Sequence, residues 1–213
     1  MSIELTASER IARIRSDFRM GVAVGFRFGL EKWLVASSET ITLSRFNGMR
    51  KLGPLELAIT DWRAQTLSTW ATDGDIARLA IPDDKDLDWV HSVCDPSDDF
   101  NTPLKGPFTP IFGGSADVSR TALAICKTAH LIPSAVMVNI TDQDIVGLDF
   151  IDLEQILSLI LNPSNQVIEV SAANVPLQVA EASRVHVFRP QDGGEEHYAI
   201  EIGNPDRKKS VLS

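Results

Sequence analysis

Short apolar runs of strand length alternate with amphipathic helical segments along this chain, and this alternation limits its fold more than any other feature. Thr6 and Glu9 have the spacing of a capping box, so they predict a helix that Gly21 ends. Apolar runs at 22–28 and 32–37, separated by Gly29, then predict a hairpin. A coiled coil is excluded because no heptad pattern persists, and a collagen-like chain is excluded because only 13 residues are glycine.

The same periodicity predicts the elements that follow. They are a buried strand at 55–59, a helix that Asp61 caps and that runs to about residue 71, a loop-rich acidic stretch at 81–110, a helix at 118–131 ended by Pro133, an apolar strand at 135–140, and a helix that Asp152 starts and Asn162-Pro163 ends. The acidic stretch does not fit a calcium-binding EF-hand loop, which needs glycine sixth and glutamate twelfth. Counted from Asp84, those places hold Trp89 and Asp95. We therefore interpret it as a solvated loop.

The pattern changes after Ser164. A short strand is predicted at 166–170 and a loop at 171–176, before two alternating runs at 184–189 and 197–203 that predict a β-hairpin. An isolated hairpin is only marginally stable in water. It must therefore pack on the preceding domain, on a partner, or on a continuation of the chain.

Composition excludes several classes of protein. The apolar fraction of 44% argues against wholesale disorder, and the net charge of −9 argues against general nucleic-acid binding. No run of about 18 apolar residues is present, so we expect no membrane span. The first residues carry charges and lack the apolar segment of a secretory signal. Two cysteines are too few for a disulfide scaffold, so we expect a reducing, cytoplasmic location.

One glycine-rich turn is a candidate phosphate site. Gly113 and Gly114 precede the predicted helix at 118–131, and the amide groups at a helix N-terminus can bind phosphate. The candidate contacts are Ser115, Ser119 and Arg120. The turn is neither a Walker A sequence nor a G-x-G-x-x-G fingerprint. Under the simpler alternative, Ser119 only caps the helix and Arg120 is solvated.

Four local motifs resemble 3,4-dihydroxy-2-butanone 4-phosphate (DHBP) synthase. Gly21–Val24 resembles its "G-x-P-V" segment, 34–41 its "L-V-I-A-A-E-K-V" strand, 77–82 its "A-x-R-L-x-L-P", and 122–136 its "A-V-D-L-A-R-L-A-G-L-x-P-A-A-V". The resemblance covers about residues 8–165. It implies a mixed α/β (α+β), three-layer fold with a twisted mixed sheet, assigned to residues 1–170, and a homodimer.

A second resemblance lies in the C-terminal hairpin. The segment 195–200 is similar to the "G-E-E-H-x-A-L" strand that opens GTP cyclohydrolase II domains. In bifunctional riboflavin-biosynthesis proteins that domain directly follows DHBP synthase. The resemblance therefore implies that residues 171–213 are a linker and β-hairpin at the beginning of such a domain, and that a GTP cyclohydrolase II domain or subunit is a partner.

The catalytic groups that the first resemblance implies are missing. DHBP synthase holds magnesium and moves protons with an acidic loop between its first two strands, where this chain has Glu31 as its one acid. The metal-binding histidine of the family falls on Val118. Together with Glu39 in the second matched motif, these are the degenerate site positions. We assign no catalytic residue and no metal ligand, and none of His91, His130, His186 and His197 takes such a role.

The zinc site of GTP cyclohydrolase II is missing too, because that family uses three cysteines whose spacing Cys94 and Cys126 do not have. We expect no cofactor in this chain, with zinc only if a GTP cyclohydrolase II domain follows. Whether Ser213 is the natural C-terminus stays open. Three functions remain: a degenerate DHBP synthase-like pseudoenzyme with a structural, dimerising or regulatory part in riboflavin biosynthesis, the N-terminal portion of a working GTP cyclohydrolase II, or a sensor of sugar phosphates or nucleotides.

Overall fold

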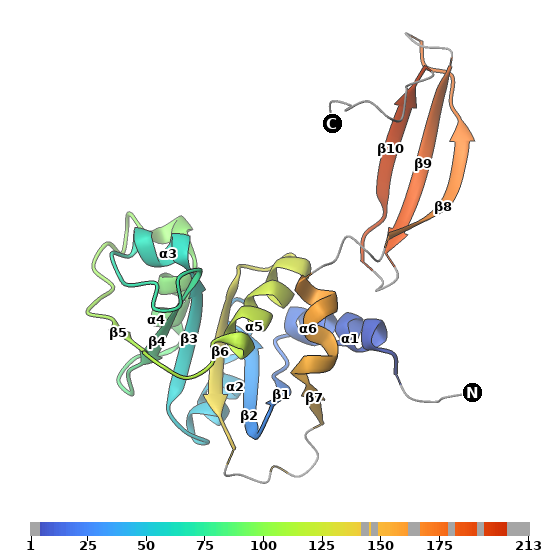
Figure 1. Cartoon of the computed structure of the whole chain (residues 1–213). Helices are drawn as coiled ribbons and strands as arrows, with labels where there is room; N and C mark the ends of the chain where they lie inside the picture. Colours follow the sequence, from blue (N-terminus) through green and yellow to red (C-terminus); the bar gives the residue numbers. More distant parts are fainter. Residues whose placement is uncertain are drawn as a thin grey trace. The chain divides into compact units, whose positions relative to one another are not determined.

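The chain forms two compact units, Met1–Leu161 and Asn162–Ser213, in a computed structural model that describes residues 5–141, 145, 149–161, 167–178, 182–190 and 194–203. Among these described residues, the first unit holds every helix and a seven-stranded sheet (Figure 1). Its elements are α1 Ala7–Arg19, β1 Val24–Phe28, β2 Glu31–Ser37, α2 Leu43–Arg50, β3 Leu55–Thr60, α3 Asp61–Thr66, β4 Ile76–Ile81, α4 Leu87–Cys94, the 3₁₀ turn η1 Pro96–Asp98, β5 Thr109–Pro110, α5 Asp117–Thr128, β6 Ser134–Asn139, β7 Phe150–Asp152 and α6 Leu153–Leu161.

The large sheet is mixed. Its strand order is β5-β4-β3-β6-β2-β1-β7, and every neighbouring pair is antiparallel except β1 and β7, which are parallel. β6 lies at the centre and pairs with both β2 and β3. The turn between β1 and β2 passes through Gly29, whose φ of +58° suits glycine. The predicted hairpin is therefore confirmed.

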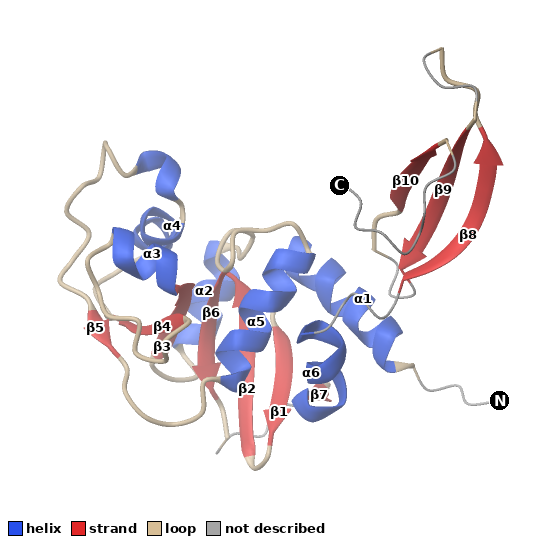
Figure 2. Ribbon diagram, turned by 45° about the horizontal axis from the view of Figure 1, so that its top comes forward, coloured by secondary structure: helices blue, strands red, loops and turns tan. Residues whose placement is uncertain are grey.

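Helices cover both faces of this sheet, which gives three layers (Figure 2). Side chains alternate between the two faces along each strand. In β2, Trp33 and Val35 join a core with α1, α5 and α6, whereas Leu34 and Ala36 join a core with α2, α3 and α4. The predicted mixed α/β fold with three layers and a mixed sheet is confirmed.

The first helix has the predicted ends. Thr6 accepts a hydrogen bond from the Glu9 amide, and the Glu9 side chain accepts one from the Thr6 amide at 2.7 Å, so the capping box is complete. The helix ends before Gly21, whose φ is +65°. This agreement arises because both signals are local to the chain.

Three helix predictions need correction. The helix near Asp61 is capped by Thr60, whose hydroxyl accepts from the Arg63 amide. It ends at Thr66, not near residue 71, because Ser68 takes a left-handed φ of +55°. The predicted acidic loop contains α4, which Asp86 caps by accepting from the Trp89 amide at 3.0 Å. The helix predicted at 118–131 is α5, which ends at Thr128 before Pro133 is reached, because His130 takes a left-handed φ of +57°.

The second unit is a three-stranded antiparallel sheet in the order β10-β9-β8, made of β8 Val167–Asn174, β9 Ser183–Pro190 and β10 His197–Ile202. The β9–β10 hairpin was predicted and is confirmed. The loop expected at 171–176 is wrong for residues 171–174, which belong to β8. A bulge between Glu169 and Ser171 lets β8 stay paired with β9. The predicted helix stop at Asn162-Pro163 and most of the hairpin connection lie outside the described residues.

Candidate functional site

The glycine-rich turn leads into α5 as predicted, and local hydrogen bonds fix its geometry. Gly113 and Gly114 have φ of +79° and +70°. The Ser115 hydroxyl then accepts from the Asp117 amide at 3.1 Å and donates to the Asp117 carboxylate at 2.8 Å. Ser115 thus orders the start of α5 through two short-range bonds.

Val118 and Ser119, in the first turn of α5, face the sheet. Val118 and Ser119 are each 2% exposed, and the Ser119 hydroxyl donates to the Met137 sulfur at 3.5 Å. The helix N-cap is Ala116, which makes no side-chain cap bond, so the alternative that Ser119 caps α5 is wrong. Val118 therefore fills core volume where the family resemblance implies a histidine.

Arg120 lies among acidic groups. Its Nε donates to both carboxylate oxygens of Asp75 at 3.0 Å, and its Nη2 donates to the Asp73 carbonyl at 3.0 Å. The hydrogen bond with Asp75 raises the pKa of Arg120 above its ordinary value. The side chain is 34% exposed but paired, so the alternative of a merely solvated arginine is wrong.

A second, deeply buried arginine supports the same turn. Arg78 on β4 is 4% exposed and binds the Asp73 carboxylate with two hydrogen bonds, at 2.9 and 3.2 Å. It also donates to the Gly113 carbonyl at 2.6 Å. Burial pushes the pKa of Asp73 upward, but the bonds from Arg78 and Thr72 outweigh burial, so the pKa lies below its ordinary value.

A carboxylate that was not singled out from the sequence lies near this arginine. Glu56 on β3 is partly buried, and its Oε2 has no hydrogen-bond partner among the residues that the structure describes. Burial raises the pKa of Glu56, Arg78 opposes that rise, and the charge of Glu31 adds to it. The sequence signal was a charged residue between Leu55 and Leu57 in a strand that is otherwise buried.

Glu31 and Glu39 are held at opposite ends of β2. Glu31 starts the strand and accepts a hydrogen bond from the Trp33 indole at 3.0 Å. Glu39 follows the strand and accepts from the Ile132 amide at 2.5 Å. At about 3.3 Å per residue, β2 spans roughly 20 Å from Glu31 to Ser37, and Glu39 lies in the turn beyond that end. The structure therefore does not bring these two degenerate positions into one site.

The positions of the other side chains that could bind a metal ion agree with this separation. Among the described residues, no group of three or more histidine, cysteine, aspartate or glutamate side chains could hold a metal ion. Cys94 and Cys126 are buried thiols, and burial raises the pKa of Cys94 and raises that of Cys126 to about 12. Such thiols disfavour the thiolate form that binds zinc. None of the described helices is both long and apolar enough to cross a bilayer.

Comparisons with known proteins place this fold. No family model matches the chain. A GTP cyclohydrolase-2 from Azospirillum brasilense is 29% identical over 167 residues, which are 74% of this chain and 43% of that protein. The chain thus spans less than half the length of this curated relative.

A solved structure of DHBP synthase shares the architecture. A cation-free crystal form superposes with a TM-score of 0.52 at 14% identity, covering 72% of this chain and 98% of that one. The enzyme from Candida albicans gives a TM-score of 0.48 at 14% identity, covering 70% and 96%. This chain therefore has a DHBP synthase-like fold and is related in sequence to a GTP cyclohydrolase-2.

Proposed function

We propose that this chain is a catalytically degenerate DHBP synthase-like domain that serves a GTP cyclohydrolase II of riboflavin biosynthesis as a structural, dimerising or regulatory part. The observation that carries the proposal is the position of Val118. A side chain 2% exposed in the apolar core stands where the family resemblance implies a metal-binding histidine. Valine has no lone pair for a metal ion and no proton to transfer.

The hydrogen bonds that Glu31 and Glu39 accept support the same proposal. Magnesium chemistry on a sugar phosphate needs several oxygen ligands at one place. Here Glu31 accepts from an indole and Glu39 accepts from a backbone amide at the other end of the strand. Both carboxylates serve the fold, so neither is placed to share a metal ion with the other.

The link to GTP cyclohydrolase II rests on the curated relative and on the β-hairpin. The relative extends well beyond the part that this chain matches. Under this proposal, zinc and the hydrolytic chemistry belong to a cyclohydrolase domain or subunit and not to Cys94 or Cys126. The homodimer remains a proposal of the same kind.

A sensor function is the weaker candidate. Its three predicted contacts are Ser115, Ser119 and Arg120. Ser115 is bonded to Asp117, Ser119 points into the core, and Arg120 is paired with Asp75. A phosphate group at this turn would have to displace those interactions, and it would approach the carboxylates of Asp75 and Asp117.

The catalytic half of the proposal is tested by assaying DHBP and formate release from ribulose 5-phosphate with magnesium. We expect no product above a protein-free blank, while an active DHBP synthase serves as positive control. Magnesium-dependent turnover that Glu31→Gln or Glu39→Gln abolishes would overturn the proposal. The partner half is tested by sedimentation of this chain with a GTP cyclohydrolase II domain, where two independently sedimenting species would refute it.

A further inference from the structure

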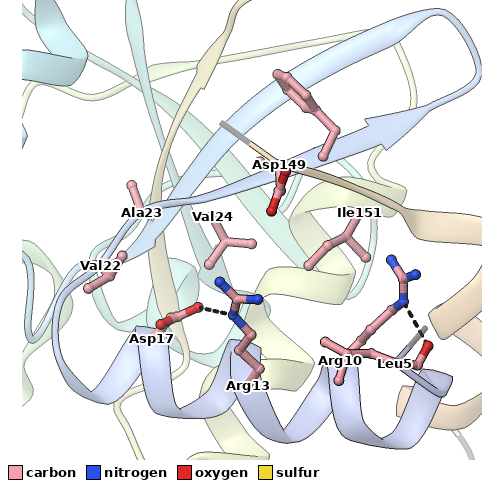
Figure 3. A pocket seen from close by; sticks show the side chains of 11 residues that line it. Leu5, Arg10, Arg13, Asp17, Val22, Ala23, Val24, Asp149 and Ile151 are labelled. Carbon is pink, nitrogen blue, oxygen red and sulfur yellow. Dashed lines mark hydrogen bonds and ion pairs between the residues drawn. The ribbon is translucent and has the colours of Figure 1, made fainter. Parts of the chain in front are cut away.

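The first unit has a cavity away from the start of α5. It measures about 520 Å³ and lies between α1, the segment that leads into β1, and β7 (Figure 3). Among the described residues, β7 pairs with Gly25–Arg27, and Val22 and Ala23 precede this paired segment of β1. The volume is in the range of cavities that bind small molecules.

Two guanidinium groups face this cavity. Arg10 and Arg13 are one turn apart on α1, and both extend from the helix toward the cavity in Figure 3. The Arg10 Nε donates to the Leu5 carbonyl at 3.2 Å, while its two terminal nitrogens have no partner within the described ranges. Arg13 forms a long ion pair, 4.0 Å from its Nε to the Asp17 carboxylate. Within the part of the chain that the structure describes, neither arginine therefore has a close ion pair.

The rest of the lining is divided between acidic and apolar groups. Asp17 and Asp149 lie on either side of the Arg13 head group in Figure 3, while Arg10 lies farther along the helix. Val24 and Ile151 add apolar surface between them. The Arg10 end of the cavity thus favours an anion, and the Asp149 end favours a hydrogen-bond donor or a cation.

We propose that this cavity binds a small bipolar phosphate compound, with its phosphate at Arg10 and Arg13 and an N–H donor at Asp17 and Asp149. An arginine fork donates two parallel hydrogen bonds to a phosphate, and two arginines match its double charge. A carboxylate ligand would leave one of the arginines without a strong partner. The acids exclude a simple anion as the best ligand, because its charge would be repelled at one end.

The test is an NMR titration of the full chain at constant ionic strength. The probes are O-phosphoethanolamine, which carries both charges, and inorganic phosphate, which carries only the anion. We expect saturable shifts at the amides of Val24, Gly25 and Ile151, with O-phosphoethanolamine binding about tenfold tighter than phosphate.

Variants separate the two ends of the cavity. Arg10→Gln should weaken both probes about tenfold or more, because it removes a charge-assisted pair. Asp149→Asn should weaken the binding of O-phosphoethanolamine, because one of the two carboxylates that accept its N–H groups is lost, and it should not weaken the binding of inorganic phosphate. Arg184→Gln, which removes an exposed arginine from β9, is the charge-matched control and should change neither. Arg10→Lys, which keeps the charge but not the fork, replaces Arg10→Gln if that variant fails to fold.

Three results would overturn the proposal. One is the absence of saturable shifts with either probe. Another is an equal loss of affinity in Arg10→Gln and Arg184→Gln, which would indicate general charge attraction. The third is shifts confined to Gly113–Val118, which would move binding to the start of α5 and support the sensor function. The cavity proposal does not depend on the loss of DHBP synthase activity, so the two can fail independently.

Discussion

Replacing Gly21 by alanine tests how α1 is joined to the sheet. The glycine φ is +65°, and an added Cβ would lie 2.0 Å from the Thr40 carbonyl oxygen and 2.7 Å from the carbonyl carbon. Backbone atoms cannot rotate away, so the α1–β1 connection must separate from the segment after β2. That movement strains two hydrogen bonds, from the Thr40 hydroxyl to the Phe18 carbonyl and from Arg45 Nη1 to the Gly21 carbonyl.

The size of the effect follows from these contacts. The left-handed backbone costs alanine about 1–2 kcal/mol, and each weakened hydrogen bond costs about 1 kcal/mol. We therefore expect Gly21→Ala to lower the free energy of unfolding by about 3–4 kcal/mol, which is roughly 10 °C in Tm for a unit of this size.

Gly29→Ala is the matched control. Gly29 also has a positive φ, +58°, but nothing lies within 4 Å of its added Cβ. This variant should therefore show the backbone cost alone, about 1–2 kcal/mol. All four tryptophans lie in the first unit, so urea unfolding followed by tryptophan fluorescence reports on the relevant unit. If Gly21→Ala is no less stable than Gly29→Ala, the proposed contact with Thr40 is wrong.

Three other predictions concern charge and thiol burial. Asp99→Asn should lower the free energy of unfolding of the first unit by about 3 kcal/mol at pH 7, because the Lys105 side chain, which is 4% exposed, loses its charged partner. Hydrogen bonds from Arg63 hold the pKa of Asp99 well below its usual value. Urea melts should therefore show the difference between variant and parent shrinking as the pH falls below about 4. Glu56→Gln should stabilise the unit by about 1 kcal/mol at pH 7. Because burial raises the pKa of Glu56 in the folded state, this gain in stability should disappear below about pH 4 in the same melts. A gain that persists below that pH would contradict a charge effect. Cys94 and Cys126 should resist a thiol reagent at pH 8 in the native chain and both react in denaturant, because burial raises both thiol pKa values; rapid native labelling would disprove their burial.

Sequence patterns predicted the elements whose signals are local. The capping box at Thr6, the hairpin turn at Gly29 and the apolar run of β6 needed only neighbouring residues. α4 was missed because its apolar stripe follows a run of acids that favours a loop. The full length of β8 was missed because its pairing with β9 comes from residues far along the chain.

The candidate site was less predictable than the fold. The predicted helix start near residue 118 agrees with α5, which begins at Asp117, but periodicity could not show that Ser119 faces Met137. Glu56 interacts electrostatically with Arg78 and Glu31, but the three residues lie on different strands. No motif with a recognisable spacing in the sequence therefore indicates this interaction. The pairing of Arg120 with Asp75 also crosses a long sequence separation. Such contacts depend on the sheet order, which periodicity does not determine.

The central position of β6 has a consequence for synthesis on the ribosome. β2 and β3 emerge early, but each needs β6 as a neighbour, and residues 134–139 are made much later. At about 5–20 residues per second, the β2 edge waits roughly 5 to 20 s for this partner. During that interval the nascent chain presents unpaired strand edges that favour aggregation. A messenger that stops before codon 134 would therefore release a product without the middle of its sheet, and chaperone binding should concentrate on nascent chains of intermediate length.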